Sequence, residues 1–269
     1  MIADTPVADI ARFHDSRYLP SNVVIAAAGA VDHDALVALA NERVPGERSE
    51  ASQLLDSTPP SAAARRRFER KDTEQYHVCL GGPGLSRHDE RRFALRVLDT
   101  IFGGTSSSRL FQEVRERRGL AYAVYSFTSA YRDTGQVGLY LGTRPDNITE
   151  GLAVVASELA RMREDPATPE ELERAKENLK GRVVLALEST GARMNRLGSE
   201  ILAGAPLLSL DEVVERIDAV SHDDLVALVE ELWAGERLSA AGIGPGQAPF
   251  DEALEAILPA GATRSVAVK

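Results

Sequence analysis

Apolar and polar positions along the middle of the chain form patterns that predict strands first and helices after them. The stretch from Phe68 to Gly81 alternates apolar and polar residues, as a strand with one buried face does. Between Arg91 and Phe102 the apolar positions fall on one side of a helix. A second helix is expected to start at Ser107 or Ser108 and to stop at Gly119, because serine caps helix starts and glycine favours helix ends.

Two strands and a long helix follow. The strands run from Ala121 to Thr128 and from Gln136 to Gly142, and the turn Arg132-Asp133-Thr134-Gly135 between them predicts a hairpin. Thr168-Pro169-Glu170-Glu171 is a capping box with proline at the first helical position, and it opens a helical stretch to about Leu202. Strands followed by helices predict an α+β fold, with a mostly antiparallel sheet covered by helices on one face.

The beginning of the chain has the same order of predicted elements as its end. A helical pattern from Val7 to Tyr18 precedes the apolar run Val23–Ala28, which is typical of a buried strand, and Asp32 is placed to cap the helix after it. A helix at Asp223–Trp233 and a strand at Leu238–Ala241 recur 215 positions later. This similarity is either chance or the sign of a domain of about 215 residues that is repeated.

A repeated domain gives a definite division of the chain. The stretch 45–66 contains Pro59-Pro60 and no sustained apolar period, so we expect it to be a linker. The tail is rich in glycine and proline, with a short helix expected near residues 251–258. The expected parts are the end of a first domain (1–44), the linker (45–66), a second domain (67–247) and a tail (248–269).

Composition narrows the classes of function. Of the 269 residues 43% are hydrophobic and 27% are charged, which is the balance of an ordinary globular protein. No apolar run is long enough to cross a membrane, and the first twenty residues carry no secretory signal, so we expect a cytoplasmic protein with no membrane partner. The net charge of −10 argues against nucleic acid as a partner.

The residues that bind metals are scarce. The chain has five histidines and one cysteine, and no two histidines lie three or four positions apart on one helical turn. His77 and Cys79 share one face of a predicted strand, but a zinc site needs three or four ligands. We therefore expect no metal in this chain.

A family resemblance is carried by the run from Gly103 to Tyr122, Gly-Gly-Thr-Ser-Ser-Ser-Arg-Leu-Phe-Gln-Glu-Val-Arg-Glu-Arg-Arg-Gly-Leu-Ala-Tyr. It resembles the second-domain signature of the pitrilysin/insulinase family of zinc metallopeptidases, in its bacterial branch similar to mitochondrial processing peptidase. The resemblance continues in Gln75-Tyr76-His77-Val78, in the start of the long helix (residues 170–176), in Leu187-Glu188-Ser189-Thr190 and in residues 13–29.

The resemblance implies that the work of catalysis is divided between domains. Family members build a closed chamber from halves that each contain two similar α+β domains. The zinc ligands and the general-base glutamate come from an inverted His-x-x-Glu-His motif and a later glutamate, all in the first domain, and this chain lacks that motif. The second domain contributes an arginine and a tyrosine that reach the substrate at the zinc, and these correspond to Arg115 and Tyr122.

Two classes of function follow from the resemblance. In the first, the chain is the non-zinc portion of a zinc metalloendopeptidase, inactive alone, which positions a peptide or unfolded protein against a metal site. That site would come from a complementary zinc-bearing domain, upstream on the same polypeptide or on a partner. In the second, it is a noncatalytic scaffold subunit of a peptidase-like heterodimer. An apolar strand without most of its sheet also predicts self-association.

Overall fold

The computed structural model describes residues 4–44, 63–258 and 264–265. The chain divides into two compact units, Met1–Thr58 with Leu185–Leu207, and Pro59–Val184 with Leu208–Lys269. Most of the expected linker, 45–62, lies outside the described residues, and so does much of the expected tail, 259–263 and 266–269. None of the described helices is both long and apolar enough to span a bilayer.

The larger unit is built on one twisted sheet. In the strand order given below, the first three pairs of neighbours are antiparallel and the last two are parallel. The mostly antiparallel α+β fold expected from the pattern is thereby confirmed. In sheet order the described strands are β3 (Ala121–Ala130), β4 (Gly135–Thr143), β2 (Tyr76–Gly84), β5 (Ser239–Gly244), β1 (Arg65–Arg70) and β6 (Arg264–Ser265).

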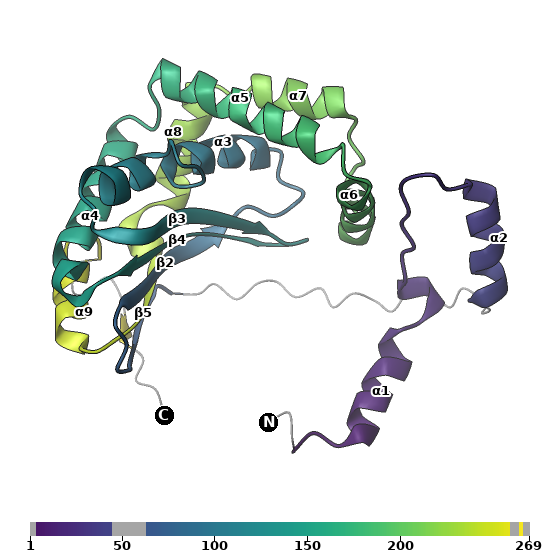
Figure 1. Ribbon diagram of the computed structural model, residues 1–269, viewed down its shortest axis with the longest axis horizontal. Helices are drawn as coiled ribbons and strands as arrows, with labels where there is room; N and C mark the ends of the chain where they lie inside the picture. Colours follow the sequence, from purple (N-terminus) through teal and green to yellow (C-terminus); the bar gives the residue numbers. More distant parts are fainter. Residues whose placement is uncertain (1–3, 45–62, 259–263, 266–269) are drawn as a thin grey trace. The chain divides into compact units, whose positions relative to one another are not determined.

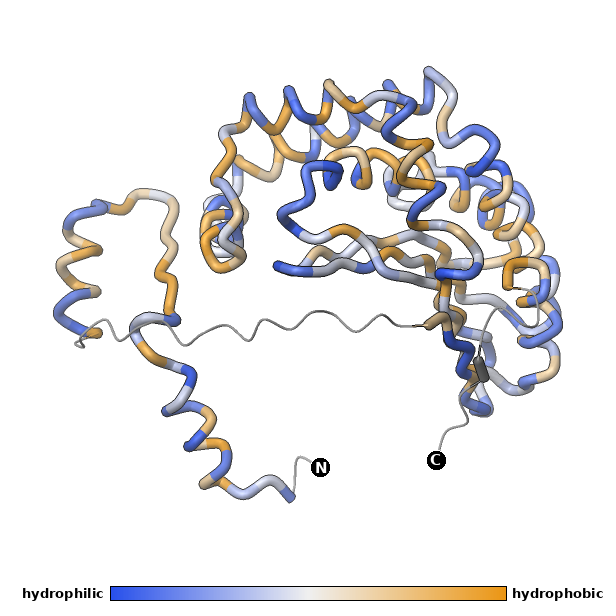
Figure 2. The backbone as a smooth tube through the Cα atoms, turned by 180° about the vertical axis from the view of Figure 1, so that it is seen from behind, coloured by the Kyte–Doolittle hydropathy of each residue, from blue (hydrophilic) through white to orange (hydrophobic). Residues whose placement is uncertain are grey.

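Helices cover one face of this sheet and enclose the core between the two layers (Figure 1). The α-helices that pack against strands include α3 (Arg92–Phe102), α4 (Ile148–Glu164), α8 (His222–Leu232) and α9 (Gln247–Leu254). Next to α3 lie α5 (Pro169–Ala186) and α7 (Leu210–Asp218). Along the helical tube, hydrophobic and hydrophilic turns alternate, as expected where each helix buries one side (Figure 2). The opposite face of the sheet carries exposed and half-buried side chains.

Two expected elements are interrupted in the structure. The single strand expected from Phe68 to Gly81 is two strands, because β5 lies between β1 and β2 and pairs with both. An irregular segment with a bend at Glu74 and Gln75 separates them. The long helix ends at Ala186, and α6 (Thr190–Ala203) starts after Ser189, whose hydroxyl accepts a hydrogen bond from the Ala192 amide.

The smaller unit contains α1 (Val7–Arg17), the 3₁₀ turn η2 (Pro20–Asn22), α2 (His33–Arg43) and α6. Asp32 caps α2 as expected, with its carboxylate 2.8 Å from the Ala35 amide nitrogen. The buried strand expected at Val23–Ala28 is wrong: no strand is assigned there, and its side chains are exposed or half-buried. This stretch is extended and hydrophobic (Figure 2) but has no described strand to pair with.

The internal similarity between the two ends is present in the structure. Helix α1 and helix α8 begin 215 positions apart and end 215 positions apart, and η2 stands in the same relation to η5 (Gly235–Arg237). Their surroundings differ. Leu225 and Leu228 of α8 are fully buried, whereas the corresponding Ile10 and Phe13 of α1 are 57% and 62% exposed.

Candidate functional site

The signature helix precedes β3 in an unusual form. After two α-helical residues, Arg109 and Leu110, it continues as the π-helix η3 (Phe111–Arg117), a geometry often found at functional sites. It stops at Gly119, as expected, where the backbone takes φ +61°, a conformation that glycine adopts without strain. The Ser108 hydroxyl does not cap the helix but donates to the Thr105 carbonyl.

A buried ion pair anchors the start of this helix. The Arg109 guanidinium donates to both carboxylate oxygens of Glu171, at 2.9 and 2.6 Å, and to the Asp165 carbonyl at 2.9 Å. Glu171 also completes the expected capping box, since it accepts from the Thr168 amide. Burial opposes ionisation of Glu171, but the hydrogen bonds from Arg109 and Thr168 outweigh it and hold the pKa of Glu171 below its ordinary value.

Two arginines of the helix are held by one acid. Arg117 and Arg118 each donate to a different carboxylate oxygen of Glu113. The hydrogen bond from Arg118, with the positive charge of Arg117, lowers the pKa of Glu113. These two guanidinium groups are thus engaged with Glu113.

Arg115 instead faces Tyr122. Its guanidinium lies between two aromatic rings, 4.7 Å from the centroid of Phe111 and 4.6 Å from that of Tyr122. One nitrogen, Nη1, donates to the Tyr122 carbonyl at 3.0 Å, seven residues along the chain. Cation–π contacts of this kind contribute about 0.5–1 kcal/mol each at exposed sites, so the side chain is fixed without losing its open donors.

Tyr122 is the extra residue of a β-bulge. Ala121 pairs with Thr143 and Ala123 with Gly142, which leaves Tyr122 between them without a partner in the ladder. Bulges re-aim side chains, and here the Tyr122 side chain is 78% exposed. The structure therefore brings together the two residues selected from the sequence, with a phenol and a guanidinium at the surface.

This pair supplies hydrogen-bond donors but cannot generate a nucleophile. A phenol O–H and a guanidinium N–H are donors to carbonyl oxygens, and both stabilise negative charge that develops on such an oxygen. No group of three histidine, cysteine or acidic side chains suited to a metal ion exists among the described residues. The residues of this part of the chain thus do not fit a zinc ion, and no chemical step is assigned to one here.

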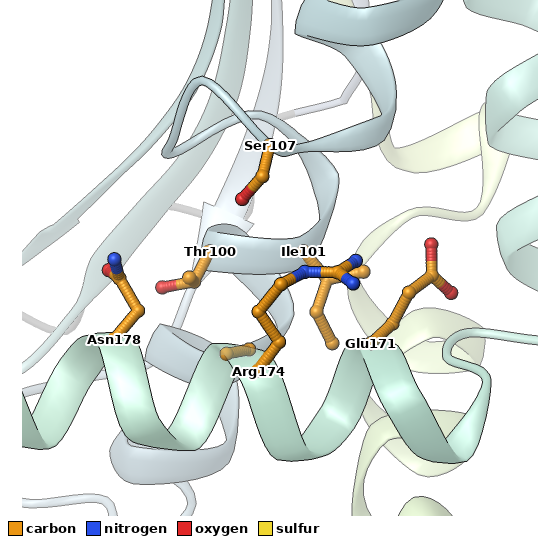
Figure 3. A pocket seen from close by; sticks show the side chains of 7 residues that line it. Thr100, Ile101, Ser107, Glu171, Arg174 and Asn178 are labelled. Carbon is orange, nitrogen blue, oxygen red and sulfur yellow. The ribbon is translucent and has the colours of Figure 1, made fainter.

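A small hollow between α3 and α5 is a separate feature. Figure 3 shows Thr100 of α3, Ser107 of the loop and Arg174, Glu171 and Asn178 of α5 around it. Its volume of about 10 Å³ holds at most one water molecule, so it is no substrate site.

Sequence reasoning missed the parts of the site that depend on tertiary contacts. The capping box identified Glu171 as a partner of Thr168, but nothing in the sequence pattern indicated its pairing with Arg109. The bulge at Tyr122 left a faint signal: Ala121, Tyr122 and Ala123 break the alternation of the strand.

Comparison with known proteins identifies the family. Residues 6–179 match the family described as peptidase M16 inactive domain. The chain belongs to the peptidase M16 family. The resemblance found in the signature is thereby confirmed. An uncharacterized zinc protease of Streptomyces coelicolor is 44% identical over 88% of this chain, and one of Bacillus subtilis is 36% identical over 85%. The chain covers 53% and 55% of these M16 relatives, about half of their length.

Solved structures share the M16 fold. A protease from Helicobacter pylori superposes with a TM-score of 0.79 at 22% identity, covering 91% of this chain and 60% of that one. A peptidase M16 inactive domain from Pseudomonas fluorescens gives 0.73 at 23% identity, covering 81% and 52%. A chain of complex III2 from Candida albicans gives 0.71 at 18% identity, covering 84% and 56%.

Proposed function

We propose that this chain is the non-zinc portion of a zinc metalloendopeptidase, which binds a peptide and positions it against a metal site supplied by another domain. The observation that carries the proposal is the pairing of the half-buried Arg115 with the exposed Tyr122 at the junction of η3 and β3. Membership of the M16 family and relatives named zinc proteases support it.

The pair would act through hydrogen bonds. The Tyr122 hydroxyl, which has no hydrogen-bond partner in the described part of the chain, would donate to the carbonyl oxygen of the bond that is cleaved. Arg115 donates Nη1 to the Tyr122 carbonyl, and its Nε lies 3.5 Å from Glu116 Oε1, which leaves Nη2 for a neighbouring peptide carbonyl. Rigid donors of this kind stabilise a developing oxyanion because they need no reorganisation as charge appears.

The partner in this proposal is a zinc-bearing domain of the same family, on the same polypeptide or on another. The extended stretch Val23–Ala28 and the exposed face of α1 would form part of that contact. The elements 215 positions later, β5 and α8, have partners in their own unit: β5 pairs with strands of the sheet, and α8 packs against other helices.

A scaffold role is the second candidate. The name of the matching family, an inactive domain, favours it. A fold accommodates both roles, so the likeness to a complex III2 chain does not decide between them.

The test combines this chain with the part of the Streptomyces coelicolor relative that it does not match. Peptidase activity on a casein-derived fluorogenic peptide is expected in the mixture and in neither part alone. A stable complex that remains inactive, while the intact relative cleaves the same peptide, would favour the scaffold role.

A further inference from the structure

A second candidate site lies on the open face of the sheet. A cavity of about 350 Å³ is bounded by side chains of β1, β2, β3, β4 and β5, all within the larger unit. This volume falls within the usual range of ligand pockets. The residues that line it are Arg65, Arg67, Cys79, Leu80, Gly81, Phe127, Gln136, Ser239, Ala240 and Ala241.

The register of the strands explains the hollow. One row across the sheet runs from Phe127 through Gly138 and Gly81 to Ser239, so three small residues follow an aromatic one. In the next row Cys79 pairs with Ala241, and Ala241 with Arg67. Small side chains on the central strands thus form a floor between an aromatic wall on β3 and an arginine wall on β1.

Three consecutive arginines of β1 are sorted by the alternation of the strand. Arg66 points to the helical side, where it donates to Glu255 at 3.2 Å and to the Leu258 carbonyl at 2.7 Å. Arg65 and Arg67 point to the open face and are exposed. Within the described ranges neither of these two guanidinium groups has an acidic partner.

We propose that this pocket binds a carboxylate of a peptide, either an acidic side chain or a chain terminus. The planar guanidinium group of arginine matches the geometry of a carboxylate. Arg65 and Arg67 both line a pocket whose floor is formed by uncharged residues. Phe127 supplies an apolar wall for the adjoining part of the peptide. The net charge of −10 disfavours acidic ligands over the surface as a whole. Binding of a carboxylate therefore depends on the local positive charge of Arg65 and Arg67.

This inference extends the proposed function by naming a class of substrate. Tyr122 and Phe127 lie on the same strand, about 15 Å apart at the usual rise per residue. An extended peptide of about five residues spans that distance, so one substrate can contact the Arg115–Tyr122 pair and the arginine pocket together.

The experiment measures fluorescence anisotropy of labelled ten-residue peptides with the whole chain. One pair of peptides differs only by Glu against Gln at an internal position, and another by a C-terminal carboxylate against an amide. We expect at least one of the carboxylate peptides to bind five- to tenfold more tightly than its neutral partner. The pair that shows this gain in affinity identifies whether the pocket binds an acidic side chain or a C-terminal carboxylate.

Variants locate the effect. Arg65→Gln with Arg67→Gln, and separately Ala241→Leu on the floor, are expected to abolish the gain. Arg132→Gln, at the exposed hairpin tip, is the control for loss of charge and should retain it. Equal affinities within both pairs, or a gain that survives both pocket variants, would overturn the inference.

The design separates this inference from the proposed function. If both neutral peptides bind and weaken in Arg115→Ala, the proposed role of Arg115 in peptide binding stands whatever the carboxylate does. If the carboxylate gain is lost in the pocket variants while Arg115→Ala changes nothing, the pocket stands and the proposed role of Arg115 fails. Absence of binding by all four peptides would contradict both.

Discussion

Neighbouring arginines of the signature helix have different partners, which a one-dimensional motif does not reveal. Arg117 and Arg118 share Glu113, whereas Arg115 lies between Phe111 and Tyr122. The stacked position restricts its guanidinium and leaves some of its donors open. Substitutions at these positions should consequently affect different properties of the protein.

The first prediction concerns Tyr122→Phe in the active assembly of this chain with its zinc-bearing partner. The change removes one donor and keeps the ring over Arg115, so folding should barely change. Loss of a donor to the developing oxyanion is expected to lower kcat by about 10²- to 10³-fold. Steady-state kinetics on a fluorogenic peptide measures this.

Arg115→Ala and Arg117→Ala complete that experiment. Arg115→Ala should raise KM and lower kcat, because a group that positions substrate acts in both states. Arg117→Ala is the matched control and should do little, since it loses only an ion pair with Glu113 in which its own side chain is 67% exposed. Full activity of both Tyr122→Phe and Arg115→Ala would disprove the assignment of the site.

The second prediction concerns Glu158 of α4, a buried acid with a poor partner. Its Oε2 lies 3.6 Å from Arg161 Nη1 and accepts no hydrogen bond in the described part of the structure. Burial raises the pKa of Glu158, and the charge of Arg161 only partly offsets it. The folded state therefore holds the proton more tightly than the unfolded state, and stability falls as pH rises through the ordinary pKa of glutamate.

Glu158→Gln removes this titration. Its free energy of unfolding in urea should exceed that of the parent chain at pH 7, and the difference should shrink as pH falls toward 4. Glu164→Gln, on the same helix but exposed, should show no such trend. A variant that is less stable at pH 7 would show that the carboxylate is stabilising there.

At the scale of elements, the signature helix depends on its attachment to α5. Arg109 is 5% exposed and bidentate to Glu171, so the ion pair fixes the start of the helix against the first turn of α5. Pairs of this kind stabilise little by themselves, but removal of one partner leaves a buried charge alone. The ion pair between Arg109 and Glu171 thus helps to position the helix that leads to Tyr122.

The third prediction is that Arg109→Met lowers the free energy of unfolding by about 3–5 kcal/mol, as measured by urea denaturation. Arg117→Met, whose pair is exposed, should cost less than about 1 kcal/mol. Because the pKa of Glu171 is lowered in the folded state, the parent chain should lose stability as pH falls through that pKa. The Arg109 variant should lose less over the same range; equal losses would contradict this account.

Local signals predicted most elements, and long-range pairing decided the rest. The capping box at Thr168, the helix stop at Gly119 and the hairpin at residues 132–135 are local, and each occurs as expected. The strand expected from Phe68 to Gly81 was wrong because the insertion of β5 between β1 and β2 depends on residues far along the chain. The ion pair between Arg109 and Glu171 was not predicted, because it too depends on residues far apart in the sequence.

At the scale of the molecule, the two similar ends of the chain have unequal surroundings. Leu228 is buried while its counterpart Phe13 is exposed, and Ile25 is exposed in an extended stretch. Apolar extended segments without a paired strand invite pairing with another chain.

The fourth prediction is therefore that the isolated chain self-associates through this stretch. Light scattering should give a mass above that of one chain, rising with concentration. Ile25→Glu should reduce the association, whereas Ile243→Glu, on the open sheet face of the larger unit, should not. A monodisperse monomer at high concentration would contradict the prediction.

Because β3 contains a bulge, the position of the Tyr122 side chain depends on the number of residues between Gly119 and Val124 as well as on which residues they are. Deletion of Ala123 would leave a regular ladder in which Tyr122 pairs with Gly142, and every later residue of β3 would keep its face. Such a protein should fold, yet Tyr122 would stand in the ordinary row of the sheet and lose its place under Arg115. A deletion of three nucleotides would thus remove the proposed site without replacing either Arg115 or Tyr122.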